Sequence, residues 1–407
     1  MARKSTYNIL MYSHDTYGLG HIRRTLAIAS HLRTPNVNIL IITGSPIVGR
    51  FSFPPQIDFV RVPGMIKMTN EEYLPLSIKI NTRHALKIRQ TIITSTAKAF
   101  QPRLFIVDKA PLGLKREIIP ALQWINRCHE NTRTVLGLRD IMDDAASTKK
   151  DWEEKGVYEV LERYYSEIWV YGNQNFYDPI REYDIPKDIS QKMIFTGYIP
   201  RAVPKAGEIN EVRKEQRLGP DQKLVVVTTG GGGDGYEHMD AYLRMLESWA
   251  ESPPFRTIMV TGPFMPKKRR IEIFNRARRI KVRTYRFYRR MERLIGAADV
   301  VVCMGGYNTV CEILSQRKPS LIIPREYPRR EQLIRAQILC EQNLADYIPW
   351  DQVEPSVLRG KLLAMIEKPE PYHEAISNFR FTGLEIMSER LAEFRGEISR
   401  EKKVLHL

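Results

Sequence analysis

Short runs of apolar residues alternate along the chain with longer stretches in which apolar residues recur every three or four positions. The short runs are typical of buried strands in a parallel sheet, and the longer stretches are typical of amphipathic helices. This alternation predicts an α/β fold. In the first half we expect a helix over Ile22–Leu32. We expect strands there at Tyr7–Tyr12, Val37–Thr43, Asp58–Val62, Leu104–Val107, Thr134–Leu138 and Ile168–Tyr171.

The alternation stops over Phe195–Gln222, which is polar, contains Pro and Gly, and is typical of a hinge or linker. It resumes at Lys223. We therefore predict two doubly wound α/β domains, residues 1–203 and 204–383, followed by a C-terminal helix within 384–407. Further strands of the second domain are expected at Thr257–Thr261, Lys281–Thr284, Val300–Cys303 and Ser320–Ile323.

Composition favours a protein that works in a reducing aqueous compartment. The chain has 407 residues, of which 43% are hydrophobic and 27% charged, the balance of a soluble globular protein. No run reaches the roughly 18 apolar residues of a membrane-spanning helix, and the N-terminus lacks the apolar region of a signal peptide. The four cysteines show no CxxC spacing, which favours neither a zinc site nor a disulfide framework. We expect a cytoplasmic location.

Positive charge is concentrated in one segment. The net charge is +16, and the basic region Lys267–Arg293 holds thirteen Lys or Arg against two Glu. Such a region suggests a polyanionic partner, for which an anionic membrane face would suit a peripheral protein. A solvated helix face is the alternative. Nucleic acid is not favoured, since no RNP-like or zinc motif accompanies the charge.

Ligands of doubly wound sheets bind where strands end, which directs attention to the strand-to-helix junctions. After the first strand, Gly18 and Gly20 give a loop that can approach a ligand, and His21 opens a helix. Arg23 occupies the third glycine position of a dinucleotide motif, so NAD or FAD binding is not favoured. A helix N-terminus lowers a histidine pKa, which suits a general base, although His21 could equally be a cap or surface residue.

Asp108 stands at the carboxyl end of the fourth predicted strand. It could hold the tautomer of His21, because the first and fourth strands of such a sheet can lie side by side. An aspartate in this place is also a common helix cap. Spacing in the sequence does not decide between the two roles.

In the second half, Gly230–Gly233 leave backbone amides unobstructed between a strand and a helix, as in a phosphate-binding loop. No Lys-Ser or Lys-Thr follows, so this is not a Walker loop. A merely flexible loop is the alternative. Phe287 and Tyr288 follow a later strand, where they would either stack on a base or pack in the core.

The stretch from Gly305 to Glu312 also permits two interpretations. Thr309 and Glu312 fit a T-x-x-E capping box at a helix start. Capping does not explain the glycine pair Gly305-Gly306, nor the later Glu331-Gln332 beyond a strand that ends near Pro324. A binding site for a phosphate-bearing ligand would explain both.

Taken together, these junctions resemble glycosyltransferases of the GT-B fold, most closely family 28. The resemblance covers most of the chain and is strongest over Phe287–Gln337. It implies two Rossmann-like domains facing a central cleft, and metal-independent transfer with inversion of a hexose-type sugar from a nucleotide-diphosphate donor, such as a UDP-sugar, to an acceptor hydroxyl. The nucleotide-sugar is then a co-substrate, and no cofactor is expected.

The resemblance also assigns roles to residues. His21 would be the catalytic base, oriented by Asp108, with Gly18 and Gly20 in the acceptor loop. The acceptor would be a glycan, a lipid-linked molecule or a small molecule. The residues assigned to the donor are Gly230, Gly231, Gly232, Gly233, Phe287, Tyr288, Gly305, Gly306, Asn308, Thr309, Glu312, Glu331 and Gln332.

The sequence departs from the family pattern in two places, and other functions stay open. Met304 stands where the related plant secondary-metabolite transferases have a phosphate-binding histidine. The peptidoglycan N-acetylglucosaminyltransferase of family 28 lacks the acid that matches Asp108. A nucleotide-sugar 2-epimerase or hydrolase would use the same donor site. A non-catalytic nucleotide-sugar-binding protein is the third alternative.

Overall fold

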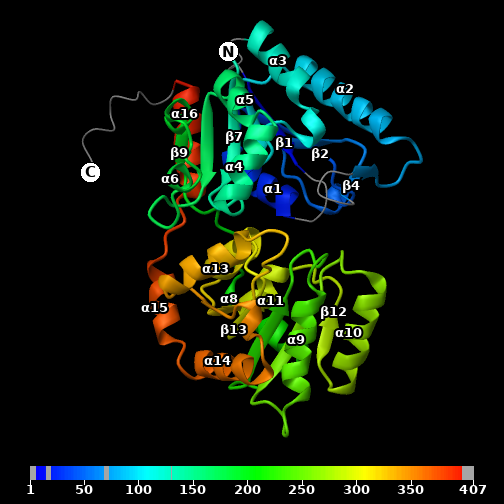
Figure 1. Cartoon of the computed structure of the whole chain (residues 1–407), viewed down its shortest axis with the longest axis vertical. Coiled ribbons are helices and arrows are strands. Elements are labelled where there is room, and N and C mark those ends of the chain that lie inside the picture. The colour runs from blue at the N-terminus through cyan, green and yellow to red at the C-terminus, as the bar shows by residue number, and fades with distance from the viewer. Residues whose placement is uncertain (1–5, 15–19, 68–72, 130, 397–407) are drawn as a thin grey trace. The chain divides into compact units, whose positions relative to one another are not determined.

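The computed structural model describes residues 6–14, 20–67, 73–129 and 131–396 and is shown in Figure 1. The chain forms two compact units. The first comprises residues 1–140, 145–199 and 381–407, and the second comprises residues 141–144 and 200–380. We expected a division at residue 203; the units divide at Ile199–Pro200, and the chain rejoins the first unit at Phe381.

The first unit is built on a seven-stranded parallel sheet in the order β3-β2-β1-β6-β7-β8-β9. The order runs outward from β1 in both directions, as in a doubly wound sheet. Helices α1 and α16 pack together, as do α2 and α3. The strands are β1 (Tyr7–Ser13), β2 (Val37–Thr43), β3 (Ile57–Arg61), β6 (Leu104–Asp108), β7 (Arg133–Arg139), β8 (Glu167–Tyr171) and β9 (Met193–Phe195).

The other elements of the first unit connect these strands, and a short antiparallel pair, β4 and β5, precedes α2. They are α1 (Gly20–Leu32), η1 (Val48–Arg50), β4 (Met65–Lys67), β5 (Tyr73–Pro75), α2 (Thr82–Phe100), η2 (Leu114–Arg116), α3 (Ile119–Cys128), α4 (Ala145–Glu154), α5 (Val157–Tyr164), α6 (Pro179–Glu182), α7 (Lys187–Ser190) and α16 (Gly383–Phe394).

Helix α16 is the last element of the chain, yet it packs in the first unit (Figure 1). Arg390 forms a buried ion pair with Glu167 of β8, and Phe394 stacks on Trp169 with ring centroids 6.5 Å apart. Gly383 begins the helix against the Tyr198 carbonyl, where a Cβ would lie only 2.7 Å from that oxygen. The chain can therefore close onto the first unit because glycine occupies this position.

The second unit has a six-stranded parallel sheet in the order β12-β11-β10-β13-β14-β15. Its strands are β10 (Lys223–Thr228), β11 (Phe255–Val260), β12 (Arg283–Tyr285), β13 (Val300–Cys303), β14 (Ser320–Ile322) and β15 (Asp346–Tyr347). Its helices are α8 (Ala206–Glu215), α9 (Tyr236–Glu247), α10 (Lys267–Arg279), α11 (Met291–Ala297), α12 (Tyr307–Ser315), α13 (Glu331–Glu341), η3 (Trp350–Gln352), α14 (Pro355–Glu367) and α15 (Glu370–Asn378).

The core of the second unit follows directly from strand alternation. Val225 and Val227 of β10 and Val300 and Val302 of β13 point to the same face, because side chains two residues apart share a face of a strand. They pack there with residues of α9, α10 and α14, including fully buried Met239. Each buried aliphatic or Met side chain contributes about 1.5–3 kcal/mol to this core.

The expected strands agree with the observed ones to within one or two residues. The largest shifts are two residues, at the starts of β11 and β12; β12 was expected from Lys281 but is observed from Arg283. Lys281 instead takes a left-handed conformation, with φ of 57°, and its amide bonds to Arg278 at the end of α10. A helix ending therefore occupies the two residues that the apolar pattern had joined to the strand.

Candidate functional site

The two sheets place functional side chains at the carboxyl ends of their strands. In the first unit, β1 and β6 are neighbours, with Tyr12 opposite Val107. His14 therefore follows β1 beside Asp108, the last residue of β6. Gly20 is the first residue of α1, and Gly18 lies outside the described residues.

His21 and Asp108 meet at this edge. The imidazole Nδ1 lies 2.5 Å from Asp108 Oδ2, and the carboxyl side chain is 5% exposed against 18% for the imidazole. An ionised Asp108 accepts a hydrogen bond from the Nδ1–H group, which leaves Nε2 as the nitrogen that can take a proton. The geometry is that of an oriented general base, and it does not match the helix-cap alternative for Asp108.

Arg24, one turn along α1 from His21, is the partner that the sequence interpretation missed. Its Nε donates to Asp108 Oδ1 at 3.0 Å, and its Nη2 donates to both carboxylate oxygens at 2.8 Å. Burial alone would raise the pKa of Asp108, but Arg24 and His21 outweigh it and hold that pKa well below its usual range. The i, i+3 spacing of His21 and Arg24 on a predicted helix was the available signal.

The imidazole of His21 stays neutral over most of the pH range. Burial lowers its pKa to about 4, and Arg24 and Lys109 add to that effect, while Asp108 opposes it. Asp108 shares its negative charge with Arg24, and its attraction for the imidazolium offsets only part of the effect of burial. A neutral imidazole at physiological pH is the protonation state that a base requires.

The pH dependence of turnover should report this pairing. We expect kcat/KM to remain flat from pH 8 to about 5 and to fall as His21 protonates near pH 4. The Arg24→Gln variant should move the acidic limb toward neutral pH, since Asp108 would then stabilise the imidazolium and the nearby cation would be gone. A pH profile of the variant, with exposed Arg33→Gln as control, measures the shift. An unmoved limb would separate Arg24 from the base.

A second histidine stands beside the first. The rings of His14 and His21 meet edge to face with centroids 6.0 Å apart, and His14 Nδ1 lies 3.3 Å from the Tyr12 hydroxyl. Burial lowers the pKa of His14 well below its usual value, and His21 and Lys109 lower it further. This end of the first sheet therefore presents two neutral imidazoles next to an ammonium group.

In the second unit, the glycine loop follows β10 and the start of α12 follows β13, its neighbour in the sheet. The two segments touch: a Cβ on Gly230 would lie 3.3 Å from Thr309 Oγ1. Gly232, at φ of 83°, lies against Thr261, where a Cβ would come within 2.0 Å of the carbonyl oxygen. Only glycine fits this position of the loop.

Backbone amides of the glycine loop divide into two pairs. The amide of Gly230 bonds to Thr228 Oγ1 and that of Gly232 to the Thr229 carbonyl. The amides of Gly231 and Gly233 have no partner among the described residues. We therefore expect these two amides, rather than all four, to be available to an anion.

The capping-box interpretation of Thr309 and Glu312 is wrong. Helix α12 begins at Tyr307, its N-cap is Gly306, and no side chain caps it. Thr309 is therefore a first-turn residue, and Glu312 lies inside the helix. The sequence pattern failed because the chain turns at left-handed Gly305 (φ of 77°), two residues after the end of β13, so that the helix starts three residues sooner than the box requires.

Gly305 and Gly306 have different reasons to be glycine. A Cβ on Gly305 would lie 2.9 Å from Ile322 Cγ2, whereas one on Gly306 would meet no atom within 4 Å. Buried Arg335 donates to the Gly305 carbonyl at 3.1 Å and fixes the turn. Asn308, the second helical residue, accepts from Arg201 Nη2 at 2.5 Å. The uncapped start of α12 is suited to a phosphate, since helix N-terminal amides and the helix dipole favour anions.

Glu331 and Gln332 open α13 and are both held by Arg325. Arg325 Nη2 pairs with Glu331 Oε1 at 2.5 Å, its backbone amide donates to Gln332 Oε1 at 3.0 Å, and its Nη1 pairs with Asp234 at 2.6 Å. Asp234 directly follows the glycine loop. The acid and amide predicted to contact a sugar are therefore connected to the predicted phosphate loop through one arginine.

The two aromatic residues after β12 differ from each other. Phe287 is 42% exposed, so the core-packing alternative does not apply to it. Tyr288 is half-buried and packs edge to face on Tyr285 at 5.2 Å. Met304 is buried and offers no phosphate ligand in place of the missing histidine.

A metal site and a membrane-spanning helix are both not found among the described residues. No group of three or more His, Cys, Asp or Glu side chains there could hold a metal ion. No helix in the same part of the chain is long and apolar enough to cross a membrane.

Solved structures with the same architecture define the class of protein. The calicheamicin glycosyltransferase aligns with a TM-score of 0.59 over 97% of this chain and 99% of its own, at 14% identity. MurG of Acinetobacter baumannii aligns at 0.58 over 95% and 99%, at 12% identity. A UDP-glucosyltransferase from Polygonum tinctorium aligns at 0.63 over 96% and 98%, at 12% identity. The chain has the two-domain GT-B fold, as the sequence predicted.

The sequence comparison is more specific. Residues 225–390 match the model of the glycosyltransferase family 28 C-terminal domain. The chain is similar to the UDP-N-acetylglucosamine–N-acetylmuramyl-(pentapeptide) pyrophosphoryl-undecaprenol N-acetylglucosamine transferases of Acetivibrio thermocellus (25% identity, 52% of this chain) and Streptococcus sanguinis (30%, 27%). The matched regions span 57% and 31% of those relatives. The expected resemblance to family 28 is confirmed.

Proposed function

We propose that the protein is a glycosyltransferase that moves a sugar from a nucleotide-diphosphate donor to an acceptor hydroxyl. The observation that carries the proposal is the oriented base, in which Asp108 holds His21 and Arg24 neutralises Asp108. A protein that only binds nucleotide-sugars has no need of a buried, neutral, oriented imidazole. The match of residues 225–390 to the family 28 domain supports a nucleotide-sugar as the donor.

In this proposal the second unit binds the donor. The start of α12 and the amides of Gly231 and Gly233 hold the diphosphate and stabilise the charge that gathers on it as the glycosidic bond breaks. These groups are part of the chain, so we propose that the reaction needs no metal. Phe287 stacks on the base, Glu312 binds the ribose hydroxyls, and the pair Glu331-Gln332 contacts the sugar.

The first unit activates the acceptor. Nε2 of His21 takes the proton from the acceptor hydroxyl, and the oxygen attacks the anomeric carbon as the bond to the diphosphate breaks. A single displacement of this kind inverts the anomeric centre. Asp108 keeps its negative charge and stabilises the imidazolium that forms. The proton balance closes when the imidazolium returns its proton to solvent.

UDP-N-acetylglucosamine is the donor we propose first, because the curated relatives carry it in their names. Those names also specify a pyrophosphoryl-undecaprenol acceptor, and we propose that one exposed apolar segment of the first unit contacts a lipid-linked molecule. Four large apolar side chains are 38–45% exposed within fifteen residues of chain, next to exposed Lys79 and Lys87. They are Leu74, Leu76, Ile78 and Ile88.

The basic region Lys267–Arg293 is less cationic than its composition indicates. Arg276 pairs with Asp240 and Glu247, and Arg293 pairs with Glu208 and Glu211. The exposed cations of this region whose side chains have no described ion pair, hydrogen bond or ring contact are Lys267, Lys268, Arg278, Arg279, Lys281 and Arg289. We propose that they add a salt-sensitive attraction to an anionic membrane face.

The test is to incubate the protein with UDP-N-acetylglucosamine and to follow UDP release with and without lipid-linked and soluble acceptors, in buffer and in EDTA. UDP release that requires an acceptor, with a product of inverted anomeric configuration by NMR, is the expected result. UDP release in the absence of an acceptor would indicate the hydrolase. Formation of an epimerised sugar in the absence of an acceptor would indicate the epimerase. Tight UDP binding with no turnover on any acceptor would leave only a binding protein.

Donor recognition gives a separate prediction at Glu312. The Glu312→Gln variant should bind UDP about 10 to 100 times more weakly, since an amide replaces the carboxylate that accepts from two ribose hydroxyls. Folding should be retained, because Glu312 is not part of a cap. Calorimetric titration with UDP measures the loss, and Glu341→Gln at the exposed end of α13 is the matched control. Equal UDP affinities of the two variants would remove Glu312 from the donor site.

A further inference from the structure

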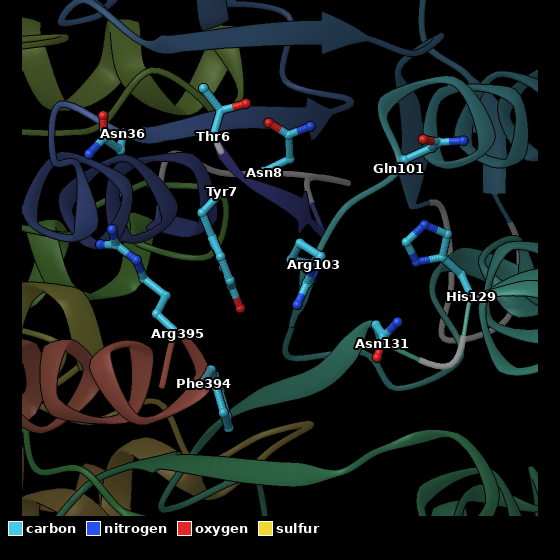
Figure 2. Close-up of a pocket in the computed structure, with 10 residues that line it drawn as sticks. All are labelled: Thr6, Tyr7, Asn8, Asn36, Gln101, Arg103, His129, Asn131, Phe394 and Arg395. Atoms are coloured by element: carbon cyan, nitrogen blue, oxygen red, sulfur yellow. The ribbon is translucent and has the colours of Figure 1, made fainter. Parts of the chain in front are cut away.

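A cavity of about 780 Å³ opens in the first unit at the amino ends of β1 and β6 (Figure 2). His21 and Asp108 stand at the opposite, carboxyl ends of the same strands. The seven residues of β1, at about 3.3 Å each, separate the two places by about 20 Å. The cavity is therefore distinct from the candidate site. Its lining residues are Thr6, Tyr7, Asn8, Asn36, Gln101, Arg103, His129, Asn131, Phe394 and Arg395.

The lining is basic. It contains two guanidinium groups and an imidazole, and none of the ten residues is acidic. Glu130 lies outside the described residues. The Arg103 side chain forms no hydrogen bond or ion pair with any residue that the structure describes. An arginine that faces a cavity without a carboxylate partner is available to an anionic ligand.

Tyr7 places a hydroxyl group among these charges. The residue is 9% exposed, and its side chain extends into the cavity with Arg103 and Arg395 on either side of it (Figure 2). The Arg395 guanidinium lies 5.9 Å from the ring centroid. Burial raises the pKa of Tyr7, although nearby Arg103, Arg395 and Arg133 oppose the increase, so the phenol remains a hydrogen-bond donor.

One wall of the cavity is aromatic. Phe394 lines it from the last turn of α16, and its ring is held in a parallel stack on Trp169. Hydrogen bonds along the sheet also position two lining residues. The Arg103 amide donates to the Asn8 carbonyl at 2.8 Å, and Asn8 Nδ2 donates to the Phe100 carbonyl at 3.0 Å. The cavity thus combines cationic side chains, carried on a fixed backbone, with an apolar surface.

We propose that this cavity binds the phosphate group of an organic phosphate. A phosphate offers several acceptor oxygens, which two guanidinium forks and a phenol O–H can share, and guanidinium groups match its oxygens in pairs. The carbon skeleton of the ligand would lie on Phe394. A soluble phosphomonoester and a phospholipid headgroup share this chemistry.

The experiment is a calorimetric titration of the full chain with inorganic phosphate and with glycerol phosphate at constant ionic strength. We expect binding that weakens about tenfold or more in Arg103→Gln, since a charge-assisted hydrogen bond is lost. Tyr7→Phe should weaken binding while it preserves the ring. Arg127→Gln, an exposed arginine on α3 outside the cavity, should bind as the unmodified chain does.

Two results would overturn the proposal. One is the absence of binding at millimolar phosphate; the other is equal affinity of the Arg103→Gln and Arg127→Gln variants, which would assign binding to another part of the chain. Sedimentation with phosphatidylcholine vesicles, with and without phosphatidic acid, distinguishes the sources. Arg103-dependent sedimentation with phosphatidic acid identifies a headgroup, whereas Arg103-dependent binding of glycerol phosphate alone identifies a soluble ligand.

Discussion

The His21→Ala variant should lose about 10²- to 10⁴-fold in kcat, the usual contribution of a positioned general base. The acceptor hydroxyl would have to lose its proton to water at the moment it attacks. The groups proposed to bind the donor belong to the second unit and His21 to the first, so affinity for UDP should not change. Rates of UDP release at saturating donor and acceptor, together with calorimetric titration with UDP, separate the two quantities.

His31→Ala is the matched control, because His31 is an exposed histidine in the last turn of the same helix. It should leave kcat unchanged. An Asp108→Asn variant should show a smaller loss than His21→Ala, since its amide still bonds to the ring but carries no charge to stabilise the imidazolium. If His21→Ala turned over at the rate of the control, another group would have to be the base, and His14, 6.0 Å away ring to ring, would be tested next.

The strands and the doubly wound α/β class were the predictable part of the fold. Runs such as Val300–Cys303 are fully buried between helices, so their apolar composition marks them whatever surrounds them. The junctions were predictable for the same reason, because function in a doubly wound sheet is confined to strand ends. His21 and Asp108 were found in this way, although 87 residues separate them.

Pairing between distant charged residues could not be predicted. Composition alone gave the basic region thirteen cations, but the acids that neutralise Arg276 and Arg293 come from α8 and α9. Arg325 likewise joins Asp234 to Glu331 across 97 residues of sequence. A count of charges in one segment carries no information about carboxylates that the fold brings from elsewhere.

Local motifs failed where tertiary structure set the boundary. Thr309 and Glu312 match a capping box by type and spacing. The helix nevertheless starts at Tyr307, because the chain turns at left-handed Gly305 after β13. The four glycines of the loop after β10 also look equivalent in the sequence. Their roles differ because Thr228 and Thr229 occupy two of the amides, and this depends on the fold of the turn.

The largest loss of stability is expected from Arg89→Met in the first unit. Arg89 of α2 and Glu117 are each 1% exposed in their side chains, and two guanidinium nitrogens donate to the two carboxylate oxygens at 2.6 Å. The Tyr12 hydroxyl donates to the same carboxylate at 2.6 Å. Without the cation, the carboxylate stays buried with the phenol as its remaining described side-chain donor, which should cost about 3–5 kcal/mol.

Native-state hydrogen exchange of the β1 and β6 amides measures this loss within the first unit, independently of the second. Exposed Arg127→Met on α3 is the control and should change protection little. The double variant Arg89→Met, Glu117→Leu should recover most of the loss, because no buried charge remains. A double variant as unstable as the single one would mean that Arg89 acts through its packing and its 2.6 Å bond to the Pro63 carbonyl.

The pH dependence of the same variant gives an independent check on the cause. Once Arg89 is absent, the Glu117 carboxylate is buried without its cationic partner, and acidic solution would favour a folded variant that no longer buries this charge. Its stability deficit relative to the unmodified protein should therefore shrink as pH falls from about 8 to 5. A deficit that stays constant over this range would show that the buried charge of Glu117 is not what destabilises the variant, and that the loss comes from the side-chain volume and hydrogen bonds of Arg89 alone.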